Sequence, residues 1–248
     1  GTILAIGAKG INGSNYPGVG AAFVYQYNGS SWALLGSQID NPIGETSQEY
    51  FGYSVSLSSD GTILAVGAYG IHSTNDNVGA VFVYKYNGSS WDPLGSNNGR
   101  ISNPNDEDDD EKFGYSISLS SDGTILAVGA RGIHSTNENV GAVFVYQYNG
   151  SSWVPLGSNN GRISNPNDEE DDENFGATVS VSSDGNILAV GAYGIHSTNN
   201  SNVGAVYVYQ YNGSSWALLG SRIDNPIDEN TFEYFGYSVS LSSDGTIL

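Results

Sequence analysis

The strongest constraint on the fold is an internal repeat. The tetrapeptide Gly-Thr-Ile-Leu starts at residues 1, 61, 123 and 245, and the variant Gly-Asn-Ile-Leu starts at residue 185, so successive units are 60 to 62 residues long. The second and third units are nearly identical, which indicates recent duplication. A chain that repeats at such a period is built from supersecondary units that bury their apolar faces against each other.

Each unit begins with two strand signals. In FGYSVSLSSDG, residues 51–61, apolar residues alternate with serines, which predicts a strand with one apolar face. Asp60-Gly61 then predicts a tight turn. The following TILAVGA, residues 62–68, is a short apolar run that predicts a strand buried on both faces. We expect its small Gly67 and Ala68 to lie in a crowded inner strand.

Two further strands follow a loop at 69–79. Residues 81–84 of AVFVYKYNGSSW are apolar without a break, so both faces of this strand are expected to pack. Asn87-Gly88 predicts a hairpin turn of type I′, and Trp91 to Leu94 predicts a short outer strand. Four strands per unit without helical periodicity predict an all-β protein, a β-propeller of four-stranded antiparallel blades.

We therefore expect one repeat domain, residues 1–248, with repeats at 1–60, 61–122, 123–184 and 185–244, while 245–248 start the next unit. A closed four-bladed ring would use the last FGYSVSLSSDG to complete the blade that begins at Gly1. However, the last four residues duplicate residues 1–4 and would compete for the same place. This overlap favours a window of a longer propeller or tandem array, and a linear fibre of stacked units is a third alternative.

Composition narrows the function. The formal net charge is −19 with only seven Lys and Arg residues, which argues against nucleic acid or anionic membranes as partners. No segment has the ~20 apolar residues of a membrane helix. The chain has no cysteine, hence no disulfide or thiol chemistry, and no methionine, so we expect a piece of something longer.

The motifs resemble a known family. Phe51-Gly52 is followed sixteen residues later by Gly67-Ala68 and then by a GAVFVY strand. This pattern resembles the FG-GAP repeat of integrin α-subunit propellers, and it is similar to tandem repeats of large surface proteins from bacteria and microalgae. The resemblance covers the whole chain. It implies a β-propeller in an extracellular adhesion or scaffold protein without catalytic activity.

The sequence departs from the integrin pattern in one respect. Integrin-type calcium blades carry Asp-x-Asp-x-Asp-Gly in the hairpin between the first two strands, whereas each hairpin here is SSDG. One carboxylate cannot supply the six to eight oxygen ligands of calcium. We therefore interpret the single aspartate as a turn residue. The four residues are Asp60, Asp122, Asp184 and Asp244.

Two acidic runs, residues 106–111 and 168–173, are the main candidate for a cation. In a propeller they share one face with the IHSTN loops. Charge blocks are usually solvated, which is the reading we favour. Calcium is the alternative, because the runs offer many hard oxygen ligands. No cofactor is required, and the candidate calcium ligands are Asp106, Asp108, Asp110, Glu111, Asp168, Glu170, Asp172 and Glu173.

Two other residues recur in every unit. An asparagine precedes a proline at positions 41, 103, 165 and 225, and a glutamate lies two residues before the FG phenylalanine at positions 49, 111, 173 and 233. We expect a structural role, in which Asn-Pro shapes the loop and the glutamate accepts backbone N–H bonds at the start of the blade.

Histidines, tyrosines and N-x-S sequons also recur in the repeat. His72, His134 and His196 occupy matching loops, but one imidazole per blade is too sparse for a transition metal. Tyrosines beside Lys85 or Gln147 are expected in interblade packing rather than stacked on sugars. N-x-S sequons predict glycans if the source is a secretory eukaryote, whereas Asn-Gly alone fits a turn. The sequons are at Asn12, Asn28, Asn87, Asn149, Asn199 and Asn212.

The leading hypothesis is a noncatalytic structural or adhesion module, extracellular or at the cell surface, which forms part of a fibre or scaffold. Its partners would be other copies, surface proteins or glycans, with neither nucleic acid nor membrane insertion. The alternative is a lectin-like propeller that binds carbohydrate or protein with its loop face. Near-identical units argue against an enzyme, because an active site needs asymmetry.

Overall fold

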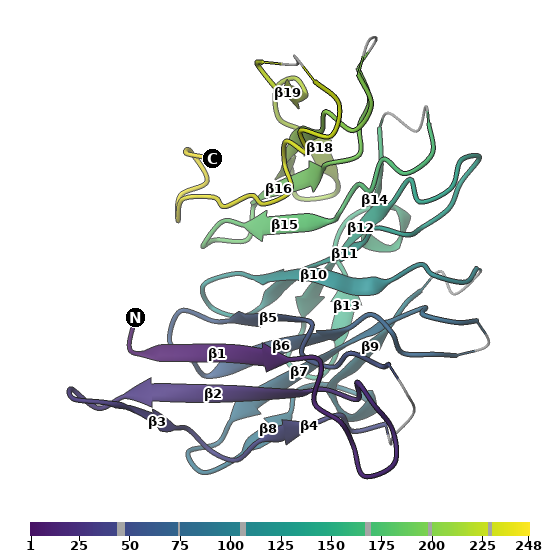
Figure 1. The fold of residues 1–248 in the computed structure, drawn as a ribbon. Helices are drawn as coiled ribbons and strands as arrows, with labels where there is room; N and C mark the ends of the chain where they lie inside the picture. The colour runs from purple at the N-terminus through teal and green to yellow at the C-terminus, as the bar shows by residue number, and fades with distance from the viewer. Residues whose placement is uncertain (44–47, 74, 105–107, 167–169, 198–199, 228–229) are drawn as a thin grey trace.

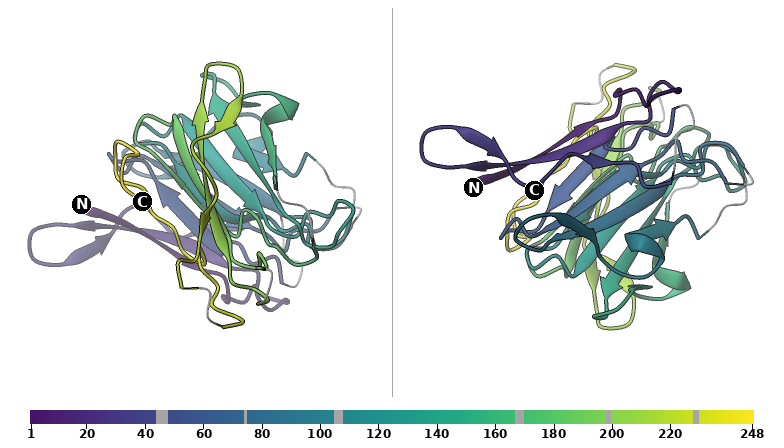
Figure 2. Two further views of the ribbon diagram at one scale, coloured as in Figure 1. Left: turned by 90° about the horizontal axis from the view of Figure 1, so that it is seen from above. Right: turned by 90° about the horizontal axis from the view of Figure 1, so that it is seen from below.

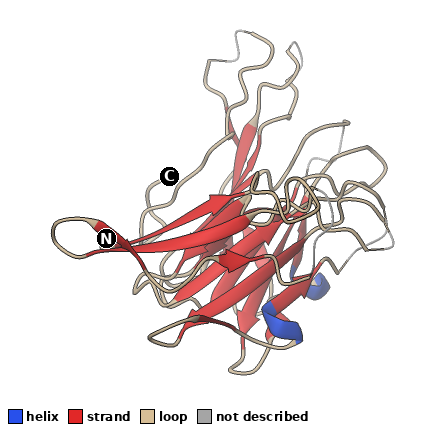
Figure 3. Ribbon diagram, turned by 60° about the horizontal axis from the view of Figure 1, so that its bottom comes forward, coloured by secondary structure: helices blue, strands red, loops and turns tan. Residues whose placement is uncertain are grey.

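The computed structural model describes residues 1–43, 48–73, 75–104, 108–166, 170–197, 200–227 and 230–248. This part of the chain is all-β and forms four antiparallel sheets, as predicted (Figures 1 and 3). Sheet 1 contains β1 (Ile3–Ala8), β2 (Ala21–Tyr27), β3 (Trp32–Leu34) and β4 (Ile39–Asp40). Sheet 2 contains β5 (Ser54–Leu57), β6 (Ile63–Ala68), β7 (Ala80–Tyr86), β8 (Trp91–Pro93) and β9 (Arg100–Ser102).

The other two sheets repeat this order. Sheet 3 contains β10 (Phe113–Leu119), β11 (Ile125–Ala130), β12 (Ala142–Tyr148), β13 (Trp153–Pro155) and β14 (Arg162–Ser164). Sheet 4 contains β15 (Thr178–Val181), β16 (Ile187–Ala192), β17 (Ala205–Tyr211), β18 (Trp216–Leu218) and β19 (Ile223–Asp224). Sheets 2, 3 and 4 each start with the FG strand. Each of these sheets therefore begins seven to ten residues before the sequence unit counted from Gly-Thr-Ile-Leu or Gly-Asn-Ile-Leu.

The outer strand of each sheet is divided into two parts. In sheet 2, β8 pairs with the end of β7 and β9 pairs with its beginning, so that Tyr84 faces Pro93 and Phe82 faces Arg100. A short 3-10 helix, η1 (Asn97–Gly99), lies between them, and η2 (Asn159–Gly161) does so in sheet 3. Asn97 and Asn98 adopt positive φ angles of 52° and 53°. Because asparagine tolerates this conformation, the strand bulges here, which the sequence analysis did not predict.

The sheets stack face to face, and the apolar cores lie between them (Figure 1). Between sheets 2 and 3, Val81 and Val83 pack in one cluster with Leu126 and Val128, and all four side chains are fully buried. Both faces of the central strands are thus covered, as predicted. At the junction of sheets 1 and 2, Tyr84 is also buried, so this tyrosine beside Lys85 packs between blades.

Glycines set the distance between neighbouring sheets. A Cβ atom added to Gly67 would lie 2.2 Å from the carbonyl oxygen of Gly114, so only glycine allows the two backbones to approach this closely. The phenylalanine of each FG also forms a parallel bridge with the preceding unit, as Phe113 does with Gly79. The FG and GA dipeptides therefore join consecutive units.

The four sheets do not close into a ring. Sheets 1 and 4 lie at opposite ends of the stack in Figure 1, so the structure is an open propeller-like array rather than a closed four-bladed ring. Within the part of the chain that is described, no helix has the length and apolar character needed to cross a membrane.

Candidate functional site

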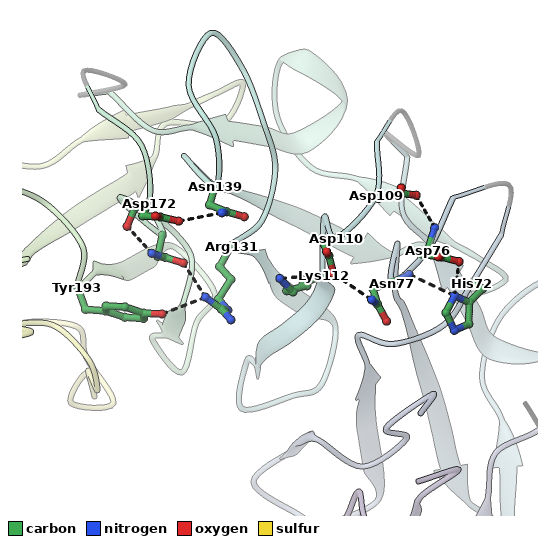
Figure 4. A network of polar contacts seen from close by, with 11 residues as sticks. His72, Asp76, Asn77, Asp109, Asp110, Lys112, Arg131, Asn139, Asp172 and Tyr193 are labelled. Atoms are coloured by element: carbon green, nitrogen blue, oxygen red, sulfur yellow. Dashed lines mark hydrogen bonds and ion pairs between the residues drawn. The ribbon is translucent and has the colours of Figure 1, made fainter. Parts of the chain in front are cut away.

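The loop face is the candidate functional site, and it is formed by the connectors between sheets and the loops before β7 and β12. The backbone N–H of Asp76 donates to Asp109 Oδ1 at 2.7 Å, and Asn77 Nδ2 donates to Asp110 Oδ1 at 2.9 Å (Figure 4). Glu138 makes the corresponding backbone bond at the next junction. The acidic connector and the IHSTN loop therefore share one face, as the sequence analysis expected.

The connector carboxylates are directed at neighbouring loops. Asp172 accepts a bond from Asn139 Nδ2 at 2.8 Å, and Glu170 pairs with His196. Asp108 is exposed, and Asp106 and Asp168 lie outside the described residues. Among the described side chains, no group of three or more His, Asp or Glu residues is arranged to hold a metal ion. Calcium binding stays a prediction.

The recurrent asparagine and glutamate bind each other, which the sequence analysis missed. Asn103 Nδ2 donates to Glu111 Oε2 at 2.5 Å and to the carbonyl of Val78 at 3.3 Å. Glu111 is fully buried and Asn103 is 6% exposed. Burial makes these hydrogen bonds important, because an unsatisfied buried carboxylate is costly. The same Asn–Glu bond is formed in all four units, by Asn41 with Glu49, Asn103 with Glu111, Asn165 with Glu173, and Asn225 with Glu233.

We call this pair the Asn–Glu clamp. It joins the loop of one blade, through the Val78 carbonyl, to the connector that starts the next blade. Two of the candidate calcium ligands, Glu111 and Glu173, belong to it, and both are at most 1% exposed. The expected bond partner was the backbone, whereas the partner that recurs in every unit is a side-chain amide. The signal in the sequence was the constant spacing of eight residues.

The hairpin aspartates form turns, as interpreted from the sequence. Asp60 accepts bonds from the Ser58 hydroxyl at 2.6 Å and from the N–H and hydroxyl of Thr62 at 2.9 Å. The Ser58 bond, followed by the Thr62 bonds, lowers the pKa of the Asp60 carboxyl. In the exposed last copy the equivalent bonds lower the pKa of Asp244 to about 2. The carboxylates of Asp60 and Asp244 therefore accept hydrogen bonds from residues of their own hairpins.

The sequon at Asn28 forms a side-chain-stabilised loop. Asn28 Oδ1 accepts the backbone N–H groups of Ser30 and Ser31, and Asn28 Nδ2 donates to Ser31 Oγ at 3.2 Å. Asn28 has no positive φ, so the predicted type I′ turn is wrong, and the asparagine side chain closes a longer loop. The serine pair has a structural role here. Asn87, Asn149 and Asn212 form the same loop, Asn12 is exposed, and Asn199 is outside the described residues.

A tyrosine column is the second feature that sequence reasoning missed. Its centre is Tyr115, whose ring lies 4.7 Å from that of Tyr53 and 4.3 Å below the Arg131 guanidinium. Arg131 Nη1 also donates to the Tyr193 hydroxyl at 3.0 Å (Figure 4). Burial, then hydrogen bonding to Tyr115, raises the pKa of the Tyr53 phenol. The column comprises Lys9, Tyr50, Tyr53, Tyr69, Tyr115, Arg131, Tyr193, Tyr234 and Tyr237.

The column crosses every blade junction because its residues recur at three positions of the repeat. One position follows the GA dipeptide, where Tyr69 and Arg131 lie, and another follows FG, where Tyr53 and Tyr115 lie. The third position directly precedes FG, where Tyr50 lies. This repetition was present in the sequence. The repetition is not obvious in the sequence, because the position after GA is occupied by tyrosine in two units and by a lysine or an arginine in the other two.

The histidines do not converge. His72 Nδ1 lies 3.1 Å from Asp76 Oδ1 in its own loop, and His196 contacts Glu170 of the adjacent connector. His72 Nδ1 also accepts the backbone N–H of Asn77 at 3.4 Å, so the contacts of His72 and His196 are with groups near their own junctions.

Family comparison matches the geometry. The model of the FG-GAP repeat matches residues 44–84, 103–146 and 165–209, which together are more than half of the chain. The chain belongs to the FG-GAP repeat family. Repeats of this family are in general noncatalytic modules and are typically found in extracellular or surface proteins. No curated protein matches the sequence.

Proposed function

We propose that the chain is a noncatalytic structural or adhesion module that acts outside the cell or at its surface. The observation that carries the proposal is that the same polar contacts recur at each junction between sheets. The distinctive residues of the repeat bind the neighbouring blade.

The outer edge of each junction uses tryptophan. Trp91 Nε1 donates to the carbonyl of Leu35 in the preceding sheet at 2.9 Å. The bonds from Trp153 to Leu94 and from Trp216 to Leu156 are each 3.1 Å long. A hydrogen bond combined with an apolar ring fixes both the distance and the register of two sheets.

The inner edge uses serine. The Ser54 hydroxyl donates to the carbonyl of Gly114 at 2.8 Å, and Ser56 Oγ accepts the N–H of Leu119 at 3.0 Å. Ser59 N–H donates to the carbonyl of Ser121 at 2.8 Å, which links consecutive hairpins directly. The equivalent serines, Ser116 and Ser118, join sheets 3 and 4. With the Asn–Glu clamp and the tryptophans, these bonds tie the junctions of sheets 2, 3 and 4 at the inner edge, the outer edge and the loop face. Such a chain is suited to a rigid spacer or scaffold.

Labelling of intact cells tests this role. An antibody raised against the chain is applied to source cells before and after permeabilisation. Extracellular or surface location predicts equal labelling in both, together with recovery of the protein from the medium or the wall fraction. Labelling that requires permeabilisation would contradict the proposal.

The tyrosine column favours a second candidate function, in which the loop face binds glycans or surface proteins. Aromatic rings with adjacent cations are suited to sugar faces. Lys9 and Arg131 lie over rings of the column, and the carbonyl of Lys112 accepts the N–H of Tyr115. A glycan array tests this candidate. Binding that is lost in Tyr69→Ala but kept in the hairpin control Tyr27→Ala would support it, and no binding to any glycan would remove the lectin form.

We also propose that the exposed hairpin tips carry N-glycans if the source secretes the chain through a glycosylating pathway. Asn28 Nδ2 makes one hydrogen bond, and a glycosylated amide keeps one N–H for it. Intact mass of native material compared with the 26.1 kDa sequence mass tests this idea. Equal masses would refute it.

A further inference from the structure

The two ends of the stack expose the two halves of the interface that is formed three times inside the molecule. On the first sheet Leu4 and Ile6 are each 43% exposed. The equivalent side chains of sheet 2, Leu64 and Val66, are fully buried against sheet 1. The outer face of sheet 1 is therefore the half-interface that a preceding sheet would cover, and we call it the head face.

The opposite half is found on sheet 4. Ile223 is 39% exposed, whereas Ile39, the equivalent residue of sheet 1, is 6% exposed because sheet 2 covers it. Leu219 is 45% exposed. Its counterpart Leu35 packs against sheet 2 and accepts the Trp91 indole bond. We call this outer face of sheet 4 the tail face.

The tryptophans show that the two faces are complementary. The three tryptophans of sheets 2 to 4 each reach the preceding sheet, whereas Trp32 has no preceding sheet and is 47% exposed. The β2–β3 hairpin that carries it projects away from the other sheets (Figure 2). On the tail face, Gly220 has no atom within 4 Å of an added Cβ, while Gly36 has the Trp91 indole 3.0 Å away. The place for a tryptophan ring is open beside Gly220.

The strand order gives the same result. β5 covers one edge of β6, but the corresponding edge of β1 has no strand partner among the described residues. Residues 235–241 have the sequence of an FG strand and are held to sheet 4, through the bridge of Phe235 to Gly204 and a bond from Leu241 N–H to Ser180 Oγ. This segment offers the strand that β1 lacks.

We propose that the tail face of one copy binds the head face of a second copy of this chain. The register follows from β5 and β6, where Leu57 pairs with Leu64. By equivalence, Leu241 of one copy lies opposite Leu4 of the next. Trp32 then donates to the Leu219 carbonyl across the junction. Because the interface is head-to-tail, copies form a ring or a filament according to whether the rotation per copy closes.

Two effects oppose this contact. Residues 245–248 occupy the position that Gly1–Leu4 of the second copy would take, and they have to move aside. They lie outside any strand, and Ile247 is 70% exposed, so little packing is lost. Each copy also carries a net charge of −19, so association is expected to strengthen as salt screens the repulsion. The sedimentation coefficient and the molar mass of the chain in solution are therefore measured at low and at physiological ionic strength.

Light scattering and sedimentation of the 248-residue chain over a range of concentrations test the inference. We expect reversible association, weakened about tenfold or more by Ile6→Glu on the head face or by Leu219→Glu on the tail face, since either buries a charge. Tyr16→Glu, at a residue 44% exposed and off both faces, is the control and should leave association unchanged. A mixture of the Ile6→Glu and Leu219→Glu chains should form a 1:1 dimer that grows no further.

Cross-linking tests the register, since the chain has no cysteine of its own. Ser56 pairs with Ala65, so Ser240 of one copy should lie opposite Ala5 of the next. Mixed Ala5→Cys and Ser240→Cys chains should form a covalent heterodimer on oxidation in preference to either homodimer. A monomer at every concentration and salt, or equal association of all variants, would overturn the inference. The inference rests on the proposed structural role only for its use in the cell, so a monomeric chain that still labels on intact cells would leave that role standing.

Discussion

Removal of the amide in the Asn–Glu clamp gives the sharpest test of how the blades are held together. Asn103→Ala deletes the amide N–H bonds to the buried carboxylate of Glu111 and to the carbonyl of Val78. A bond to a charged group contributes about 1.5–3 kcal/mol and one to a neutral carbonyl about 0.5–1.5 kcal/mol. We therefore expect the free energy of unfolding to fall by about 2–4 kcal/mol.

The matched control uses the same pair where it is more open to water. Asn225 and Glu233 form the equivalent bond but are only half-buried. Asn225→Ala should therefore cost about half as much or less, because water can replace part of the lost bonding. Both variants keep the proline that follows, and Asn225→Ala also removes the bond from the Ile227 N–H to Asn225 Oδ1 in an exposed loop.

The assay combines denaturant unfolding with amide hydrogen exchange, because repeat proteins can lose cooperativity and unfold in parts. Exchange in Asn103→Ala should rise first in the connector near Glu111 and in the adjacent loop near Val78, and remain unchanged in sheet 1. A loss of stability below about 0.5 kcal/mol, the size usual for surface substitutions, would refute the claim that the clamp holds the junction. So would an equal loss in Asn225→Ala.

Three further outcomes are expected. Gly129→Ala should prevent folding or lower the melting temperature strongly, since its Cβ would lie 1.9 Å from a carbonyl oxygen of the next blade, while Gly10→Ala, with no atom within 4 Å, should not. The hairpin aspartates have pKa values below 3.8, with that of Asp244 at about 2, so their stabilisation is complete above pH ~4 and is lost as the pH falls toward 2, which an acid titration by circular dichroism would detect. If the acidic connectors bind calcium, millimolar calcium should raise the melting temperature, and Asp108→Asn with Asp110→Asn should reduce that rise; no shift in the parent chain would remove the calcium hypothesis.

The sequence predicted the strands and their burial because these depend on local patterns. Residues 62–68 and 80–84 read as two-sided apolar runs, and the structure buries them on both faces. The turn role of Asp60 also followed from local chemistry. Asn-Gly was wrongly assigned to a type I′ turn because that prediction uses only the Asn-Gly dipeptide. The loop conformation depends on four residues, since the Asn28 side chain accepts the backbone N–H groups of Ser30 and Ser31.

The contacts between units were harder to predict, since they depend on how two sheets are placed and not on one sheet alone. The spacing of Asn103 and Glu111 was visible, but the connector had to fold back before the two side chains could meet. Tyr53 and Tyr115 are equivalent residues of successive units, and their rings meet only because neighbouring sheets are close together at their inner strands. The pattern of residues within one unit does not predict the distance between neighbouring sheets.

The serines of the FG strand carry this argument further. Their alternation with apolar residues predicted a strand with one apolar face. In the structure Ser54 and Ser56 bond to the backbone of the next blade, so the polar side of the strand is an interface as well. Both sides of this strand therefore contact other strands. Each unit therefore carries residues that bind the next unit. The first and last sheets carry these residues too, and for this reason Ile6 and Leu219 are exposed at the two ends of the stack.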